Sequence, residues 1–253
     1  MVIESGDPAT AIAIVLVRTS HPGNIGAAAR AMRTMGLTNL RLVAPERFPH
    51  REASAMAAGA DDVLEQAQLF DSLEEAVADC HWVMGCTARR RSVASDEFDP
   101  RTAAARIWDA VARGPVALVF GCERTGLSNE ELQHCHASVH IPSVADFSSL
   151  NLAAAVQVLA WEVRREALAR ADVGPAMVLS EDETPATVAQ LEGMFEHLEQ
   201  MLEDIDFHKG RSPARVMRRL RQLLLRAEPD QREVRVLRGI FSDTQRMVRA
   251  ARE

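Results

Sequence analysis

Short apolar segments alternate with helical segments along the first part of this chain. The apolar segments, read as strands, are residues 12–17, 39–43, 81–86, 116–120 and 139–141. The first of them is a continuous apolar run, as expected for a strand that is buried on both faces. Strands that alternate with helices predict an α/β fold, with a mostly parallel sheet and helices on both of its faces.

The composition divides the chain into three parts. Residues 1–170 hold the strands and end in a long helix, which we expect from residue 149 to about residue 168. Residues 171–186 are rich in Gly, Pro and acidic residues and predict a linker. Residues 187–253 carry three helical patterns and predict a small helical extension.

We expect this protein to be cytoplasmic. Its 253 residues include no run of 18 or more apolar residues, so no membrane span is predicted. The apolar run at residues 12–17 lacks the preceding basic segment and the following cleavage site of a signal peptide. This run is therefore interpreted as the first buried strand.

The cysteines give no sign of a metal site. The four cysteines of the chain have neither CxxC nor zinc-finger spacing. The His-Cys-His stretch at residues 134–136 does not change this, because neighbouring side chains on a helix or strand point in different directions. We therefore expect no metal, and four reduced and mostly buried thiols.

Charge is unevenly distributed. The net charge of −7 argues against a uniformly basic nucleic-acid binder. Residues 175–206 contain nine acidic residues and no Lys or Arg, whereas residues 207–253 contain thirteen basic and five acidic residues. Such a basic part can hold a phosphate backbone. The residues predicted to do so are Arg211, Arg215, Arg218 and Arg226, aided by Lys209, Arg89, Arg90 and Arg91. The alternative is that these arginines pack against the acidic stripe of the preceding helix.

Three polar segments follow strands, which is where α/β proteins bind ligands. The first contains Asn24, predicted in a loop, and Arg30, predicted on the following helix. Gly23 and Gly26 allow a close backbone approach there, and the alanines around Arg30 leave its guanidinium uncrowded. The alternative for Arg30 is an ordinary ion pair on an amphipathic helix. The glycine fingerprints of P-loop and Rossmann nucleotide sites are absent.

The second segment begins where the strand at residues 116–120 ends. Ser128 and Glu131 predict a capping box for the next helix. Glu123 has no such explanation, and a carboxylate at a strand tip either pairs with an arginine or orients a substrate group.

The third segment is Ser-Ser-Leu-Asn at residues 148–151, which opens the long helix. Ser148 or Ser149 can cap that helix. Asn151, expected in the first helical turn, would then keep its side chain free to bind a ligand placed at the helix start.

Together the three segments resemble the motifs of the SpoU branch of the SPOUT methyltransferases. The resemblance rests on Asn24 with Arg30, on FGCERTGLSNEE and on SSLNLAAAVQV. The resemblance is strong over about residues 10–168 and looser in the tail. Within the family, the chain most resembles the tRNA 2′-O-ribose methyltransferases. It implies a homodimer and a deep trefoil knot in the C-terminal half of the sheet, which pattern reasoning alone does not supply because knots are nearly absent among folds.

The resemblance also implies a methyl donor and a set of site residues. The donor is S-adenosylmethionine, and its expected contacts are Cys86, Thr87, Ala88, Gly121, Ile141, Ser149, Leu150 and Asn151. The expected catalytic residues are Arg30, Asn24, Glu123, Ser149 and Asn151. Cys86 stands where a small hydroxyl residue is expected, and Phe147 stands where close relatives often have Tyr.

The implied reaction moves a methyl group to a ribose 2′-hydroxyl of tRNA, with nucleotide 32 of the anticodon loop as the expected target. Holding the reacting atoms near contact contributes roughly 7–11 kcal/mol. The counterpart of Arg30 is the proposed base in the family, but the pKa of a guanidinium lies above about 12. Arg30 therefore either accepts a proton after desolvation or stays cationic and stabilises the developing alkoxide. The alternatives to this function are a ribosomal-RNA 2′-O-methyltransferase of the same branch and a non-catalytic RNA-binding module.

Overall fold

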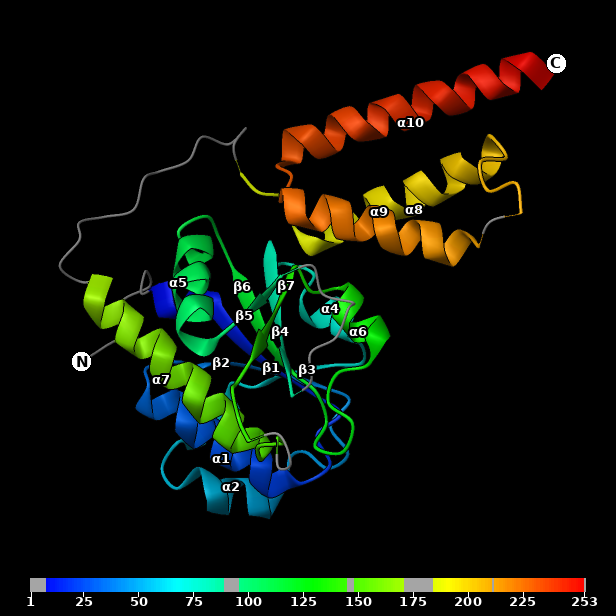
Figure 1. Cartoon of the computed structure of the whole chain (residues 1–253). Coiled ribbons are helices and arrows are strands. Elements are labelled where there is room, and N and C mark those ends of the chain that lie inside the picture. Colours follow the sequence, from blue (N-terminus) through cyan, green and yellow to red (C-terminus); the bar gives the residue numbers. More distant parts are fainter. Residues whose placement is uncertain (1–7, 89–95, 145–147, 171–183, 211, 253) are drawn as a thin grey trace. The chain divides into compact units, whose positions relative to one another are not determined.

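The structure is a computed structural model, which describes residues 8–88, 96–144, 148–170, 184–210 and 212–252 (Figure 1). The chain forms two compact units, the first ending at Met177 and the second beginning at Val178. Most of the predicted linker, residues 171–186, lies outside the described residues.

The strands of the first unit form one seven-stranded parallel sheet in the order β3-β2-β1-β6-β4-β7-β5. In chain order they are β1 (Ile12–Val17), β2 (Asn39–Val43), β3 (Gln68–Phe70), β4 (Trp82–Thr87), β5 (Glu97–Phe98), β6 (Val116–Phe120) and β7 (Ala137–His140). The prediction of a parallel α/β sheet is confirmed. The short edge strands β3 and β5 were not predicted, because two or three residues are too few to show a pattern.

The core of the first unit lies around β1 and β6. Every residue of both strands is buried, and the two strands pair in register, with Ile14 opposite Leu118. Continuous apolar runs suit this position because the strands are covered on both faces.

Helices cover both faces of the sheet. A 3₁₀ helix, η1 (Pro8–Ala11), comes first, followed by α1 (Pro22–Thr34), α2 (Arg51–Ala57), α3 (Asp61–Glu65), α4 (Leu73–Ala76), α5 (Pro100–Val111), α6 (Asn129–Gln133) and α7 (Leu152–Arg170). Figure 1 shows α1, α5 and α7 on one side of the sheet, and α4 and α6 on the other. The helix α7 packs against both α1 and α5. No described helix is long and apolar enough to cross a membrane.

Two predicted helix starts were wrong. The helix α1 begins at Pro22, so Asn24 lies in its first turn and not in a loop. Proline is well suited to a first helical position, because its missing N–H has no partner there in any case. The helix α7 begins at Leu152, three residues after the predicted start.

The close packing of α1 depends on a glycine. A Cβ on Gly26 would lie 1.9 Å from the carbonyl oxygen of Ala53 in α2. Any side chain at this position would therefore push α1 and α2 apart, and with them the segment that carries Asn24.

The second unit contains α8 (Val188–Asp204), α9 (Pro213–Ala227) and α10 (Gln231–Arg252). Its core includes the predicted apolar stripe of α8, with Leu191, Phe195 and Leu198 buried. On α9 the predicted inward residue Leu223 is instead 55% exposed, and Met217 is buried. At 3.6 residues per turn these two positions lie about 120° apart around the helix, so they cannot both face the core.

Candidate active site

A pocket of about 470 Å³ lies at the carboxyl ends of β4, β6 and β7. Parallel sheets place ligands at this edge because loops from several strands converge there. Its lining consists of Cys86, Thr87, Ala88, Phe120, Gly121, Cys122, Glu123, Arg124, Thr125, Gly126, Leu127, Ile141, Ser148, Ser149, Leu150, Leu152 and Ala155. All the predicted cofactor contacts except Asn151 are among these residues. The lining also brings Cys86 and Cys122 into one cavity.

The loop after β6 folds tightly back on its own strand. A Cβ on Gly121 would lie 2.1 Å from the carbonyl carbon of Gly126 and 2.2 Å from the amide nitrogen of Leu127, so only glycine fits. The loop closes with Gly126 N–H donating to the carbonyl of Cys122 at 2.9 Å. The residues of this loop therefore present backbone groups directly to the pocket.

The predicted capping box ends this loop. Ser128 N–H donates to Glu131 Oε2 at 2.7 Å, and Glu131 N–H donates to Ser128 Oγ at 3.1 Å. Glu131 is buried and also forms an ion pair with Arg18, the residue directly after β1. The loop is thus fastened to the neighbouring strand at its far end.

Glu123 accepts four hydrogen bonds from the residues between β1 and α1 and from the first turn of α1. Its Oε2 accepts from the N–H and the Oγ of Ser20 at 3.1 and 2.9 Å, and its Oε1 accepts from His21 N–H and Asn24 Nδ2 at 3.3 and 2.8 Å. Partial burial acts to raise the pKa of Glu123, but the hydrogen bonds, those from Asn24 and Ser20 foremost, lower it to about 2. The carboxylate is therefore a fixed anion and is unsuited to accept a proton.

Asn151 joins this network to the start of α7. Its Nδ2 donates to Asn24 Oδ1 at 3.0 Å, while its Oδ1 accepts from the N–H groups of Ala153 and Ala154 at 2.9 and 3.4 Å. The expectation that Ser148 or Ser149 caps α7 was therefore wrong, as was the expectation of a free Asn151 side chain. Asparagine is among the best helix caps, and its oxygen reaches the first free N–H groups when the helix begins at Leu152.

Arg30 lies exposed on α1 and is not among the pocket-lining residues of its own chain. Six helical positions separate it from Asn24, which turns the two side chains about 120° apart. Among the described residues, no ion pair includes Arg30, so the alternative of an ordinary surface pair gains no support.

The chain matches the model of the SpoU rRNA methylase family over residues 11–161. It belongs to the SpoU methylase family. Residues 189–253 match the model of the C-terminal domain of the tRNA methyltransferase TrmJ. The helical second unit is therefore also a domain known from this family.

Relatives in this family are similar over almost their whole length. The tRNA (cytidine/uridine/adenosine-2′-O-)-methyltransferase TrmJ of Pseudomonas aeruginosa is 48% identical over 244 residues, covering 94% of this chain and 95% of the relative. The tRNA (cytidine/uridine-2′-O-)-methyltransferase TrmJ of Salmonella typhimurium is 49% identical over 232 residues, covering 91% and 95%. The crystal structure of TrmJ from Z. mobilis has a TM-score of 0.79 at 38% identity, covering 91% of this chain and 97% of that one.

Sequence reasoning missed Ser20 and Arg18, although the SpoU family motif begins only a few residues later. Both lie directly after β1, so their place at a strand tip was the available signal. A lone serine or arginine at a strand end has many structural uses. The acidic partners, Glu123 in the loop after β6 for Ser20 and Glu131 of α6 for Arg18, became visible only when the sheet brought β1 and β6 together.

The predicted RNA contacts of this SpoU-family chain are partly described. Lys209, Arg215 and Arg218 are exposed, whereas Arg89, Arg90, Arg91 and Arg211 lie outside the described residues. The arginine of α9 that binds the acidic helix α8 is Arg221, which is not in the predicted stripe. Its guanidinium holds both carboxylate oxygens of Glu192 and lies 4.4 Å from the ring centre of Phe195.

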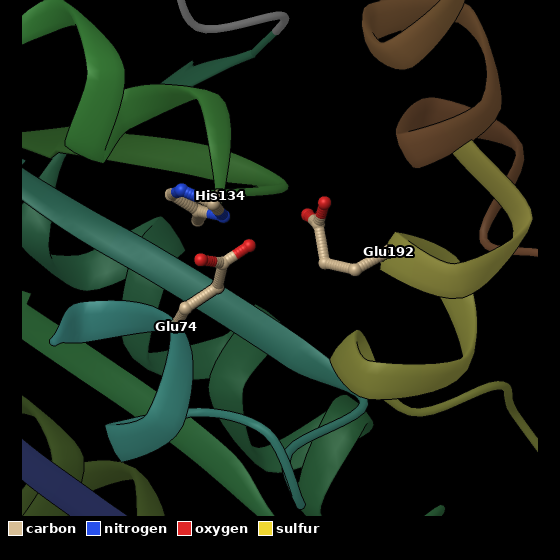
Figure 2. A group of neighbouring side chains, drawn as sticks. All are labelled: Glu74, His134 and Glu192. Atoms are coloured by element: carbon tan, nitrogen blue, oxygen red, sulfur yellow. The ribbon is translucent and has the colours of Figure 1, made fainter. Parts of the chain in front are cut away.

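The three side chains drawn in Figure 2 come from two units that are not placed relative to one another, so they are not treated as one site. Figure 2 shows Glu74 of α4 and His134, which directly follows α6, in the SpoU domain, drawn with Glu192 of α8. Glu192 belongs to the second unit and is already bound by Arg221. Glu74 and His134 alone fall short of the four ligands of a structural zinc site, so no metal site is derived from this group.

Proposed function

We propose that this protein transfers a methyl group from S-adenosylmethionine to a ribose 2′-hydroxyl of tRNA, at nucleotide 32 of the anticodon loop. One observation carries the proposal. A pocket with the lining expected for the methyl donor lies beside the hydrogen-bonded network of Glu123, Asn24 and Asn151. The near full-length similarity to two tRNA 2′-O-methyltransferases supports the substrate class.

The pocket fits a cofactor of this size and chemistry. Its volume of about 470 Å³ lies within the usual range of small-molecule sites. Gly121 has only backbone atoms to offer to a ligand in the pocket, and Ile141 and Leu150 offer apolar side chains. When bound, S-adenosylmethionine supplies a methyl group on a sulfonium, which is already a good electrophile. The task left to this chain is to orient the ribose and to help remove one proton.

The network orients groups but does not take the proton. Glu123 is an anion with a pKa of about 2 and four donors, and the amides of Asn24 and Asn151 are not bases at neutral pH. An arginine side chain is a cation that offers five N–H donors and no acceptor. This favours the version in which Arg30 stays cationic and stabilises the developing alkoxide, while water takes the proton.

We propose a homodimer in which Arg30 of one chain completes the pocket of the other. The support is that Arg30 does not line the pocket of its own chain. In addition, Trp161 and Leu168 of α7 are 52% and 58% exposed. Large apolar side chains at the surface are typical of a face that a partner chain covers. The trefoil knot that the family resemblance implies stays part of this proposal.

The second unit is proposed to bind the phosphate backbone of tRNA. Lys209, Arg215 and Arg218 are exposed there, so they are available to neutralise phosphates. Their contribution would be to hold the tRNA, with the base sequence read elsewhere.

The function is tested with purified protein, radiolabelled S-adenosylmethionine and total tRNA, followed by mapping of the methylated nucleotide. The expected product is a 2′-O-methylated nucleotide 32. Ribosomal RNA is the matched alternative substrate, and methylation of it alone would favour the other activity of the branch. Tight tRNA binding with no methyl transfer would favour a non-catalytic module.

A further inference from the structure

Ser20 makes two hydrogen bonds to one oxygen of Glu123, a residue 103 positions later in the sequence. Its N–H lies 3.1 Å and its Oγ 2.9 Å from Glu123 Oε2. Among the described residues, both hydrogen bonds to Oε2 come from Ser20, while His21 and Asn24 bind Oε1. Ser20 therefore fixes the rotation of the carboxylate about its own axis.

That rotation determines the direction of the next two side chains. With Oε1 aimed at Asn24 Nδ2, the amide of Asn24 must present its oxygen on the other side. Asn24 Oδ1 then accepts from Asn151 Nδ2, whose oxygen caps α7 beside the pocket-lining Leu150. Each donor faces an acceptor, so turning over the amide of Asn24 or of Asn151 leaves its neighbour unpaired.

We propose that Ser20 is a positioning residue for methyl transfer, acting through Glu123 and Asn24 on Asn151. This inference rests on the proposed function, because Asn24, Glu123 and Asn151 are the groups assigned to orient the ribose. Ser20 itself is not a lining residue of the pocket.

The loop that lines the pocket has other anchors, so removing the Ser20 hydroxyl leaves the pocket in place. The capping box and the Arg18–Glu131 ion pair hold its far end, and the Cys122–Gly126 hydrogen bond closes its near end. In a variant without the hydroxyl, the backbone N–H of residue 20 still donates to Glu123 Oε2. The expected effect is therefore on turnover and not on cofactor affinity.

The test compares Ser20→Ala with Ser20→Thr in the full-length protein. Losing one hydrogen bond to a charged group corresponds to a fall in kcat of about 10- to 100-fold for Ser20→Ala. The dissociation constant for S-adenosylmethionine, measured by calorimetry, and KM for tRNA should stay within about threefold. Ser20→Thr keeps a hydroxyl and should recover most of kcat.

Ser72→Ala is the matched control. Ser72 caps α4 by accepting from Glu75 N–H at 3.2 Å, and it is not a lining residue of the pocket. Ser72→Ala should lower the melting temperature about as much as Ser20→Ala does, but its kcat should equal that of the wild type.

A kcat for Ser20→Ala equal to that of the wild type would overturn the inference. So would a drop in melting temperature and in cofactor binding that matches the drop in kcat, with no recovery in Ser20→Thr, since that pattern marks a purely structural role. A wild type that binds S-adenosylmethionine but methylates no RNA would contradict the proposed function, and this inference with it. An active wild type beside an equally active Ser20→Ala contradicts the inference alone.

Discussion

Asn151 donates from its Nδ2 to the Oδ1 of Asn24 at 3.0 Å, across 127 positions of sequence. This contact joins the first turn of α1 to the start of α7. Because Asn24 also donates to Glu123, three segments that follow β1, β6 and β7 share one hydrogen-bonded network.

Asn151 has two functions, which two substitutions tell apart. Asn151→Ala removes both the helix cap and the link to Asn24, so we expect a stability loss of about 1 kcal/mol together with loss of methyl transfer. Asn151→Asp keeps an oxygen for the cap but has no N–H to donate to Asn24 Oδ1. It should keep its melting temperature and still lose activity. An active Asn151→Asp would show that the link to Asn24 is dispensable.

Glu123 should make the folded protein sensitive to acid in a defined window. Its pKa is lowered from 4.5 to about 2 in the folded state, so its contribution is fully present above about pH 4.5 and fades as the pH falls towards 2. After discounting for solvent screening, this contribution is on the order of 1 kcal/mol. Unfolding of the wild type and of Glu123→Gln by urea at several pH values measures it. A difference between them that stays constant from pH 6 to pH 2 would contradict the assignment.

Cys122 should react first among the cysteines, and the cofactor should protect it. Burial acts to raise the pKa of Cys122, but hydrogen bonds from Thr125 and Arg124 lower it, whereas burial raises the pKa of Cys80, Cys86 and Cys135 to about 12. The thiolate is the reactive form. Peptide mass spectrometry after iodoacetamide treatment should find Cys122 alkylated, and more slowly when S-adenosylmethionine is present. Equal rates with and without it would place the cofactor outside this pocket.

Arg30→Ala should bind S-adenosylmethionine normally and lose about 10²- to 10⁴-fold in methyl transfer, the usual range for a group that acts on the transferred proton or its charge. Mixing this variant with Glu123→Gln tests the proposed dimer. If Arg30 acts across the interface, each mixed dimer contains one intact site, and about a quarter of wild-type activity returns because half the dimers are mixed. If Arg30 acts within its own chain, mixing restores nothing.

The exposed arginines of α9 should bind tRNA through phosphates. Replacing Arg215 and Arg218 by Glu should weaken tRNA binding and reduce its salt dependence by about one unit of slope for each lost contact. Arg51→Glu with Arg101→Glu makes the same charge change at exposed positions of the first unit and is the control. Filter binding at several salt concentrations compares them. Equal losses in both double variants would point to a general effect of charge.

Strong local patterns were enough to predict much of the fold. Residues 12–17, 39–43 and 116–120 are strands as predicted. The first and third are continuous apolar runs, and the second, with the sequence NLRLV, is apolar at three of its five positions. The capping box of Ser128 and Glu131 was also predictable, since both partners lie within one turn. In contrast, β5 contains only two residues and forms by pairing with β7 at the sheet edge. Such pairing leaves no local pattern.

The sequence by itself determined the parallel sheet, the tight glycine loop after β6 and the presence of a carboxylate there without a local partner. Only the tertiary structure decided what that carboxylate does. Ser20 and Asn24 reach Glu123 because β1 and β6 are neighbours in the sheet, and Asn151 reaches Asn24 because α7 packs on α1. Hydrogen bonds act over about 3 Å, so residues a hundred positions apart acquire their partners, and Glu123 acquires its lowered pKa, only after the chain has folded.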